Sequence, residues 1–197
     1  MSHLYFKTGT MGSGKSYDLI RVAKQYERNN IDFLAMKSII DDREGKDKCI
    51  IKSRGIKDTI EGIWVQKDMN LLDYFDEQIE AGRNIKIVII DEVQFLSVEQ
   101  IYQLSDIVTE RGISVMCYGL KNDFTGKLFP SIAILFAYAD KIEEIRSICW
   151  CGKCANHNAR VINGKVVTKG DIIGIEKGNI SYVPLCNKHF KMKKINK

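Results

Sequence analysis

The segment Thr8–Ser16, TGTMGSGKS, constrains the fold of this chain more than any other, because it fits the pattern G-x-x-x-x-G-K-[ST]. Residues 3–9 are typical of a short β-strand, and apolar residues recur at helical spacing over residues 15–30. A glycine loop between a strand and a helix directs backbone N–H groups and the helix N-terminus towards an anion. The alternative, a glycine turn with an incidental lysine, does not account for the flanking strand and helix. We therefore interpret the segment as a phosphate-binding loop.

The second half of this site follows the apolar stretch IKIVII, which is typical of a strand buried on both faces. Asp91 comes directly after it and can hold Mg²⁺ opposite the Ser16 hydroxyl, while Lys15 can reach the β- and γ-phosphates. Glu92 adds a carboxylate beyond what the metal needs, which suggests a base, although both acidic residues would also suit a simple strand end. A nucleoside triphosphate with Mg²⁺ is the expected ligand. The expected ATP–magnesium site consists of Gly9, Thr10, Met11, Gly12, Ser13, Gly14, Lys15, Ser16, Asp91, Glu92, Val93 and Gln94.

Strands and helices alternate over the first three quarters of the chain, which implies a parallel sheet covered on both faces. The predicted strands cover residues 3–9, 31–38, 85–96 and 113–120, and the predicted helices cover 15–30, 70–84, 97–112 and a segment from Pro130. Ser97 as N-cap, Gln100 three residues later and Gly112 beyond the last turn delimit the third helix. The expected fold class is α/β, a P-loop NTPase-like sheet with flanking helices.

Two regions depart from this alternation. Residues 41–58 are charged and rich in glycine, so they are predicted to form a loop with weak strand character at 49–51. Beyond residue 146 the sequence has short apolar runs, many turn residues and no amphipathic helix. We expect a nucleotide-binding domain over residues 1–146 and a small β domain, similar to a zinc ribbon, over 147–197.

Four of the six cysteines lie in the last quarter of the chain. Cys149 and Cys151, with Cys186 and His189 some 35 residues later, suit a tetrahedral structural zinc site. Spacing alone leaves this open, because Cys151 and Cys154 form the commoner C-x-x-C pair. His157 is interpreted as a surface histidine, Arg160 as either a site residue or a surface charge, and Cys49 and Cys117 as small buried apolar residues.

The composition is that of an ordinary globular protein, with 45% hydrophobic and 28% charged residues. There is no apolar run of about eighteen residues, and the start MSHLYFK does not resemble a signal peptide, so a cytoplasmic location without membrane contact is expected. The net charge is +5, but five of the thirty basic residues lie in the last ten positions. A solvated basic tail is favoured over a nucleic-acid-binding patch.

A phosphate-binding loop serves kinases and helicases alike, and DEVQ at 91–94 also suits an ATPase. The combined motifs, however, resemble the thymidine kinases of the cellular, bacterial and phage type. The matching segments, in the family's order, are GTMGSGKS (9–16), IDDR (40–43), DEVQFL (91–96), YGLKNDFTGKLF (118–129), ICWCGK (148–153) and YVPLCNKH (182–189). The short C-x-C-G form is most similar to the enteric-bacterial and phage branch.

This resemblance implies transfer of a phosphoryl group from ATP to the 5′-hydroxyl of thymidine, with deoxyuridine as a further substrate, in pyrimidine nucleoside salvage. It assigns the base to Glu92 and the Mg²⁺ side to Asp91, and it makes Lys15 and Arg43 the other catalytic residues. The substrate-binding residues that it implies are Met11, Asp41, Leu120, Phe124, Phe129 and Tyr182. It also implies a loop over residues 169–186 that closes on the nucleoside.

For the metal, the resemblance favours Cys149 with Cys151 over Cys151 with Cys154, and so a zinc site of Cys149, Cys151, Cys186 and His189. It further implies a homotetramer that is inhibited by thymidine triphosphate. Two other classes of protein remain as alternatives. One is a nucleic-acid-stimulated ATPase whose zinc ribbon binds DNA or RNA, although one short lobe is too small for a helicase. The other is a nucleotide-binding module without catalysis.

Overall fold

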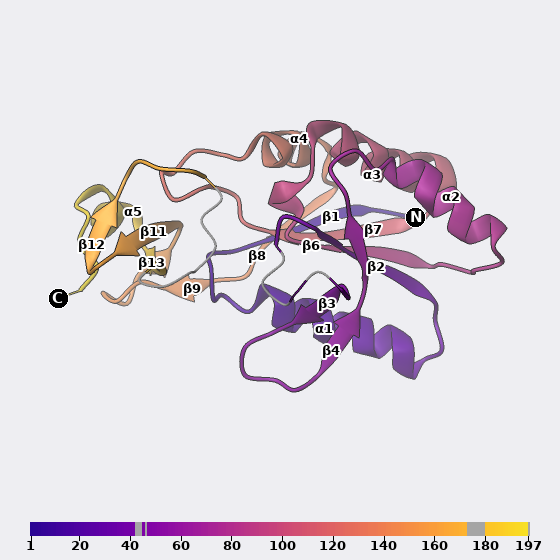
Figure 1. Ribbon diagram of the computed structural model, residues 1–197, viewed down its shortest axis with the longest axis horizontal. Helices are drawn as coiled ribbons and strands as arrows, with labels where there is room; N and C mark the ends of the chain where they lie inside the picture. Colours follow the sequence, from indigo (N-terminus) through magenta and orange to yellow (C-terminus); the bar gives the residue numbers. More distant parts are fainter. Residues whose placement is uncertain (42–44, 46, 173–179, 197) are drawn as a thin grey trace.

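The computed structural model describes residues 1–41, 45, 47–172 and 180–196. A six-stranded sheet forms its centre, with the strand order β5-β2-β6-β7-β1-β8 and every neighbouring pair parallel (Figure 1). Its strands are β1 (Leu4–Thr8), β2 (Phe33–Ser38), β5 (Ile63–Val65), β6 (Ile87–Asp91), β7 (Ser114–Gly119) and β8 (Lys141–Glu144). All five residues of β6 are buried, as expected for a central strand covered on both faces. The expected α/β fold is confirmed.

Helices cover both faces of this sheet. One face carries α2 (Leu71–Glu80), α3 (Val98–Arg111) and α4 (Pro130–Tyr138), and the other carries α1 (Lys15–Arg28) with the hairpin of β3 (Ile50–Lys52) and β4 (Thr59–Glu61) (Figure 1). Two apolar clusters result, one on each side of the sheet. A short 3-10 turn, η1 (Val93–Phe95), follows β6. The sheet is therefore packed on both faces, and functional residues are expected on the loops at the ends of its strands.

Local signals determine where the helices begin and end. The Ser97 side chain accepts a hydrogen bond from the Gln100 backbone N–H, and the Gln100 side chain accepts one from the Ser97 N–H, so the predicted capping box is confirmed. Gly112 ends α3 with φ 68°, a left-handed conformation that favours glycine. The capping residue of α2, Asn70, accepts hydrogen bonds from two backbone N–H groups.

The structure adds elements that the sequence patterns missed. Strand β3 falls where weak strand character was expected, but β4 and β5 were not predicted, because three residues are too few to show a period of two. In the last quarter, the structure contains the helix α5 (Asn187–Lys191), where no helix was expected. Its five residues make barely more than one turn, which is too short for an amphipathic pattern.

The remaining strands belong to residues 147–172 and 180–196, which are called the small unit from here on. It contains β9 (Ser147–Ile148), β10 (Cys154–Ala155), β11 (His157–Ile162), β12 (Lys165–Val167) and β13 (Ile180–Leu185), together with α5. Strand β11 lies between β12 and β13 in an antiparallel sheet. Figure 1 places the small unit beyond the sheet, at the end opposite the N-terminus.

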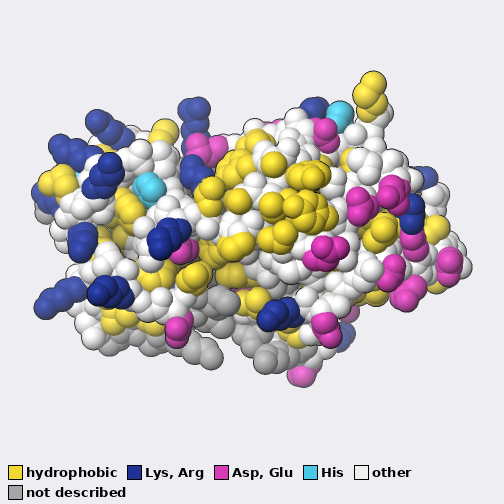
Figure 2. Space-filling view, turned by 90° about the horizontal axis from the view of Figure 1, so that it is seen from above, with side chains coloured by type: hydrophobic (Ala, Val, Ile, Leu, Met, Phe, Trp, Pro, Cys, Tyr) yellow, Lys and Arg dark blue, Asp and Glu magenta, His cyan; other side chains and the backbone are white. Residues whose placement is uncertain are grey.

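Side chains of different kind gather on different parts of the molecule. On the face seen in Figure 2, basic side chains gather over the end that carries the small unit, and apolar side chains gather near α4. Among the residues described, no helix combines the length and the apolar character that crossing a membrane requires. The carboxyl ends of β1 and β6, which carry the glycine loop and the acidic pair, point towards the small unit, so the site forms between the two.

Candidate active site and metal centre

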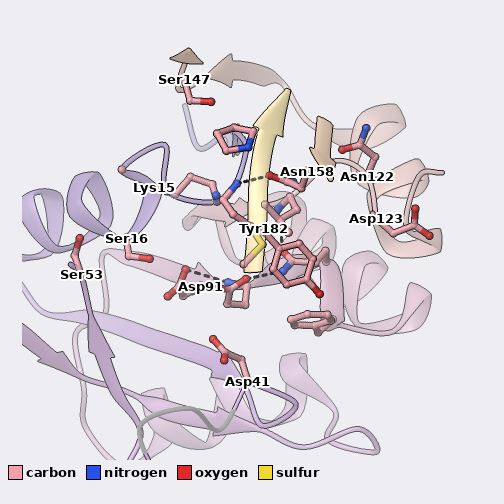
Figure 3. Close-up of a pocket in the computed structure, with 18 of the residues that line it drawn as sticks. Lys15, Ser16, Asp41, Ser53, Asp91, Asn122, Asp123, Ser147, Asn158 and Tyr182 are labelled. Atoms are coloured by element: carbon pink, nitrogen blue, oxygen red, sulfur yellow. Dashed lines mark hydrogen bonds between the residues drawn. The ribbon is translucent and has the colours of Figure 1, made fainter. Parts of the chain in front are cut away.

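A cleft of about 950 Å³ lies between the carboxyl ends of the sheet strands and the small unit (Figure 3). Its walls come from the glycine loop, the ends of β2 and β6, the segment after β7, the tip of the β3–β4 hairpin, and strands β11 and β13. A volume of this size accommodates two small ligands end to end, since binding clefts generally measure about 300–1,000 Å³.

The glycine loop has the backbone shape that anion binding requires. Gly12 and Gly14 adopt φ values of 74° and 94°, and Gly14 directly precedes α1, so the backbone N–H groups of this turn converge at the helix N-terminus. Gly9 allows close packing, because an added Cβ would lie 2.4 Å from Ser13 Oγ. Lys15 folds back over the loop, where its ammonium donates to the carbonyl oxygens of Thr10 at 2.8 Å and Gly9 at 3.3 Å.

Two hydroxyl groups of the loop differ in whether they have a partner. Ser13 Oγ is buried and has no hydrogen-bond partner among the residues that the structure describes. Thr10 is buried too, and its hydroxyl is hydrogen-bonded to the Ser147 hydroxyl of the small unit. A buried hydroxyl without a partner is costly, and a phosphate oxygen is the acceptor that would satisfy it. The loop therefore fits a phosphate ligand: Met11, Gly12, Gly14, Lys15 and Ser16 line the cleft, whereas Gly9, Thr10 and Ser13 are not among its lining residues.

The acidic pair lies at the carboxyl end of the buried central strand. Asp91 is 4% exposed, and its carboxylate accepts a hydrogen bond from the Glu92 backbone N–H at 3.0 Å. Burial, and then the charge of Glu92, raise the pKa of Asp91 above its usual range. A site where a buried carboxylate is destabilised in its charged form favours a bound cation. The carboxylate oxygens of Asp91 and the hydroxyl oxygen of Ser16 are ligand atoms that fit Mg²⁺. Both Asp91 and Ser16 line the cleft and are labelled in Figure 3.

Glu92 is held in an unusual conformation. Its φ of 53° is left-handed, which few residues other than glycine adopt without support. The support comes from the Gln94 side chain. Its Nε2 donates to Glu92 Oε2 at 2.5 Å, and its Oε1 accepts from the Leu120 backbone N–H at 3.0 Å. Gln94 thus joins the acidic pair to the segment after β7.

Val93 belongs to the expected ATP–magnesium site, but its side chain faces the core. It is 0% exposed and is not among the residues that line the cleft, so a contact with a nucleotide would have to come from its backbone. The sequence pattern D-E-V-Q suggested four site residues in a row, but the tight turn η1 directs the third of them inwards.

A buried ion pair lies beside Asp91. Asp41 is 4% exposed and accepts from Lys37 Nζ at 3.1 Å, and the same ammonium lies 5.8 Å from the centre of the Trp64 ring. Lys37 is opposite Asp91 in the β2–β6 ladder and lines the cleft, yet no sequence motif pointed to it. Arg43, the cation expected in this segment, lies outside the described residues.

The other end of the cleft is apolar and aromatic. All six residues expected to bind substrate line the cleft: Met11, Asp41, Leu120, Phe124, Phe129 and Tyr182. They come from the glycine loop, the end of β2, the segment after β7 and strand β13. Of the loop expected to close on a nucleoside, residues 173–179 lie outside the described residues. Its described root contributes Ile172 to the cleft wall.

Strand β11 contributes two residues that sequence reasoning did not assign. Asn158 is 2% exposed, and its side-chain oxygen accepts from the Met11 backbone N–H at 2.7 Å, so it joins the small unit to the glycine loop (Figure 3). Arg160 is 4% exposed, which excludes the reading of it as a surface charge. Neither residue belongs to a short sequence motif. The only sequence signal that they share is their spacing of two, which places both side chains on the same face of β11.

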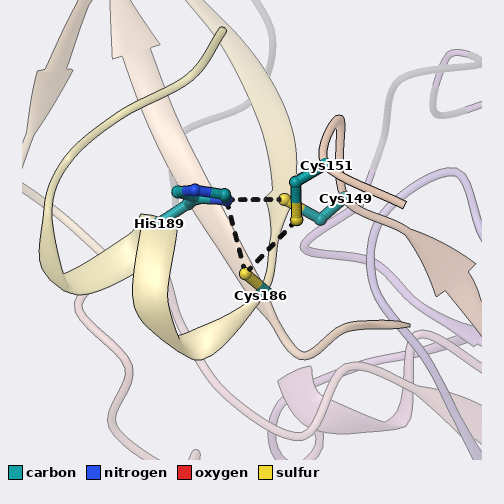
Figure 4. A group of neighbouring side chains, drawn as sticks. All are labelled: Cys149, Cys151, Cys186 and His189. Carbon is teal, nitrogen blue, oxygen red and sulfur yellow. Dashed lines mark hydrogen bonds between the residues drawn. The ribbon is translucent and has the colours of Figure 1, made fainter. Parts of the chain in front are cut away.

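Three cysteines and one histidine form a candidate metal centre in the small unit (Figure 4). The ligand atoms of Cys149, Cys151, Cys186 and His189 all lie within 4.8 Å of one another. His189 Nδ1 is 3.4 Å from the sulfur atoms of both Cys149 and Cys186, and the sulfur atoms of Cys151 and Cys186 are 3.9 Å apart. Tetrahedral zinc with Zn–S bonds of about 2.3 Å places sulfur ligands about 3.8 Å apart, so the donor set fits this ion.

The neighbouring cysteine and histidine lie outside this centre. Cys154 is exposed and does not belong to the cluster. His157 is partly exposed and is not one of the clustered residues, in line with its interpretation as a surface histidine, but its ring also stacks on Phe190 at 4.2 Å and is hydrogen-bonded to Asn122 and Asn187. Cys49 and Cys117 are buried, as expected, and burial raises the pKa of the Cys49 thiol to about 11.

Comparisons with known proteins agree with this arrangement. The family described as "Thymidine kinase" matches residues 2–190 of the chain. A thymidine kinase of Francisella tularensis subsp. tularensis is 38% identical over 197 residues, covering 97% of this chain and 98% of that protein. One of Lactococcus lactis subsp. lactis is 41% identical over 192 residues, covering 96% and 97%, and one of Haemophilus influenzae is 39% identical over 195 residues, covering 98% of each.

Proposed function

The chain belongs to the thymidine kinase family, and from this premise we propose that it transfers the γ-phosphoryl group of ATP to the 5′-hydroxyl of thymidine. One observation supports this most: a single cleft is lined by the glycine loop, by the acidic pair Asp91 and Glu92, and by a set of aromatic and apolar residues. A phosphoryl donor and a nucleoside bound in this cleft would meet at the acidic pair. Deoxyuridine, which differs from thymidine by one methyl group, is a further expected substrate.

The proposed mechanism assigns a step to each group. Lys15 and the N–H groups of the glycine loop hold the β- and γ-phosphates, and Ser16 and Asp91 would hold Mg²⁺, which neutralises phosphate charge. Glu92 accepts the proton of the 5′-hydroxyl as its oxygen bonds to the γ-phosphorus. The bond from that phosphorus to the bridging oxygen breaks, and ADP leaves. Arg43 is proposed to neutralise charge on the transferred group.

On the nucleoside side, Phe124, Phe129 and Leu120 are proposed to enclose the flat pyrimidine, and Met11 to contact it from the glycine loop. Tyr182 and Asp41 are proposed to contact the sugar end. Supporting this, all five apart from Asp41 present apolar or aromatic surface to the cleft, whereas Asp41 is held by Lys37 at the polar end. Buried apolar walls with a few placed polar groups are the usual construction of such sites.

The cluster of three cysteines and His189 is proposed to bind a structural zinc ion. Residues 1–146 are proposed as the nucleotide-binding domain and 147–197 as the metal-binding domain. The apolar cluster of the small unit contains only five buried residues, so a metal would provide the folding energy that this core lacks. Because Asn158 and Ser147 contact the glycine loop, the metal would also stabilise the phosphate site.

One assay tests the proposed function. ADP release is measured with thymidine, with deoxyuridine and with single-stranded DNA as the added acceptor, at saturating ATP and Mg²⁺. We expect thymidine to stimulate ADP release, with thymidine monophosphate formed in equal amount, and DNA to have no effect. Stimulation by DNA alone would contradict the proposal. The same assay with added thymidine triphosphate tests the proposed inhibition by the end product. The proposed role of the enzyme is nucleoside salvage in the cytoplasm.

The proposed homotetramer has support on the surface of α4. This helix is apolar on every side, and apolar side chains gather near it on the face seen in Figure 2. The neighbouring Leu128 and its own Tyr138 are 53% and 50% exposed. A helix that is apolar all round is normally covered on all sides. We expect light scattering to give the mass of four chains, and Tyr138→Asp to give a smaller species. An unchanged mass in that variant, or a monomeric wild type, would contradict the use of this face.

A further inference from the structure

Arg160 lies behind the nucleoside side of the cleft. It is 4% exposed, yet it is not among the residues that line the cleft. It lies on β11, the middle strand of its sheet, directly opposite Tyr182 on β13 and Val167 on β12. Burying a guanidinium group is costly unless its N–H groups have partners, so its contacts are informative.

Each part of the guanidinium has a partner. Nε donates to the Tyr182 hydroxyl at 2.8 Å, Nη1 donates to the carbonyl of Asp171 at 2.7 Å, and Nη2 donates to the carbonyl of Ile172 at 3.0 Å. The guanidinium carbon lies 3.7 Å from the centre of the Phe124 ring. Arginine is suited to this combination, because its planar fork donates in several directions while one face stacks on an aromatic ring.

Three of these four partners line the cleft, and they come from three separate segments. Phe124 belongs to the connection between β7 and α4, Ile172 to the segment after β12, and Tyr182 to β13. Figure 3 shows Tyr182 projecting into the cleft from its strand. The Arg160 side chain therefore contacts all three segments. These contacts set the distances between Phe124, which is proposed to stack on the base, Tyr182, which is proposed to contact the sugar, and Ile172.

We propose that Arg160 is a positioning residue for the nucleoside, which acts through Phe124, Tyr182 and Ile172 without touching the substrate itself. This inference rests on the proposed thymidine kinase reaction. The proposed role concerns the nucleoside and not ATP. The glycine loop contacts the same strand through a different side chain, that of Asn158, which accepts a hydrogen bond from the Met11 N–H. Loss of the Arg160 fork is therefore expected to disturb the nucleoside and to spare ATP.

The substitution Arg160→Lys tests this, since it keeps the positive charge and removes the fork. We expect the KM for thymidine to rise at least about tenfold and the KM for ATP to stay within about twofold, because lost hydrogen bonds loosen only the nucleoside walls. Arg83→Lys is the matched control. The guanidinium of Arg83 also donates in several directions, in its case to the Asp32 carboxylate and to the backbone carbonyl of Phe33, but it lies at the far end of β2. We expect both KM values to be unchanged in that variant.

Trypsin gives a second readout that a purely structural role would not move. Lys169 is exposed just before the segment that Arg160 holds. We expect thymidine to slow cleavage after Lys169 in the wild type and to give no protection, at the same concentration, in Arg160→Lys. The melting temperature and the metal content of the variant establish that it is folded. Protection equal to that of the wild type would overturn the inference.

Should Arg160→Lys fail to fold, Gly170→Ala tests the same contact from the other side. Gly170 has φ +130°, a conformation that alanine adopts only with strain, and an added Cβ would be in ordinary contact with Arg160 Nη1 at 3.6 Å, so we expect alanine there to shift the segment that Arg160 holds. We expect the same selective rise in the KM for thymidine. A KM for thymidine within twofold of the wild type in the folded variant, or an equal rise for ATP, would overturn the role of Arg160. A wild type that does not phosphorylate thymidine would instead refute the proposed function.

Discussion

Replacing Glu92 by glutamine is expected to lower kcat for thymidine phosphorylation by at least about a hundredfold, the usual contribution of a well-placed base. The substitution is nearly isosteric. The new side chain keeps an oxygen that can accept from the Gln94 amide, as Glu92 Oε2 does now at 2.5 Å, and it leaves the left-handed backbone at this position in place. What it loses is the ability to accept the proton of the 5′-hydroxyl.

The measurement is steady-state turnover together with the affinity for ATP by calorimetry. We expect the affinity for ATP to be kept, because the glycine loop and Lys15 are unchanged. Glu99→Gln is the matched control, since Glu99 is an exposed residue in the first turn of α3 and is expected to leave turnover unaltered. Turnover within a few-fold of the wild type in Glu92→Gln would mean that another group takes the proton.

Replacing Cys149 by serine is expected to abolish metal binding and to reduce thymidine phosphorylation by a comparable or larger factor. Cys149 is 1% exposed at the centre of the small unit, and its sulfur lies 3.4 Å from His189 Nδ1. A serine hydroxyl is a poor zinc ligand. The apparent binding free energy of a structural zinc ion, about 10–16 kcal/mol, exceeds what a small apolar core can replace.

The informative comparison is with Cys154→Ser, which makes the same chemical change three residues after Cys151. Cys154 is exposed and lies outside the cluster, so we expect this variant to keep one metal ion per chain and wild-type activity. Metal content by mass spectrometry and turnover decide the matter. Loss of metal in Cys154→Ser, with metal kept in Cys149→Ser, would mean that the C-x-x-C pair holds the ion instead.

Sequence patterns predicted the features that depend on neighbours along the chain. The glycine loop, the capping box of α3 and the buried strand before Asp91 each extend over a few consecutive residues, so their signals are local. The combination of motifs also indicated the family. Within the cleft, most of the residues expected to bind substrate were found together because their motifs follow strand ends, and parallel strands bring those ends to one edge; Tyr182 comes instead from within β13 of the small unit.

The residues that were missed depend on contacts between distant segments. Lys37 lies opposite Asp91 only because β2 pairs with β6, and Arg160 meets Phe124 only because the small unit folds against the segment after β7. A single lysine in a strand or a single arginine near a cysteine cluster carries no periodic signal. Val93 illustrates the converse, since a local pattern cannot show that the turn η1 directs its side chain into the core.

The position of β1 in the sheet has a consequence for synthesis of the protein. The first strand of the chain lies between β7 and β8, which are among the last strands of the sheet to be made. A nascent chain shorter than about residue 114 has neither partner for the strand that leads into the glycine loop. The nucleotide site is thus assembled after most of the polypeptide has left the ribosome, and pairing over so long a sequence separation is expected to be a slow step of folding.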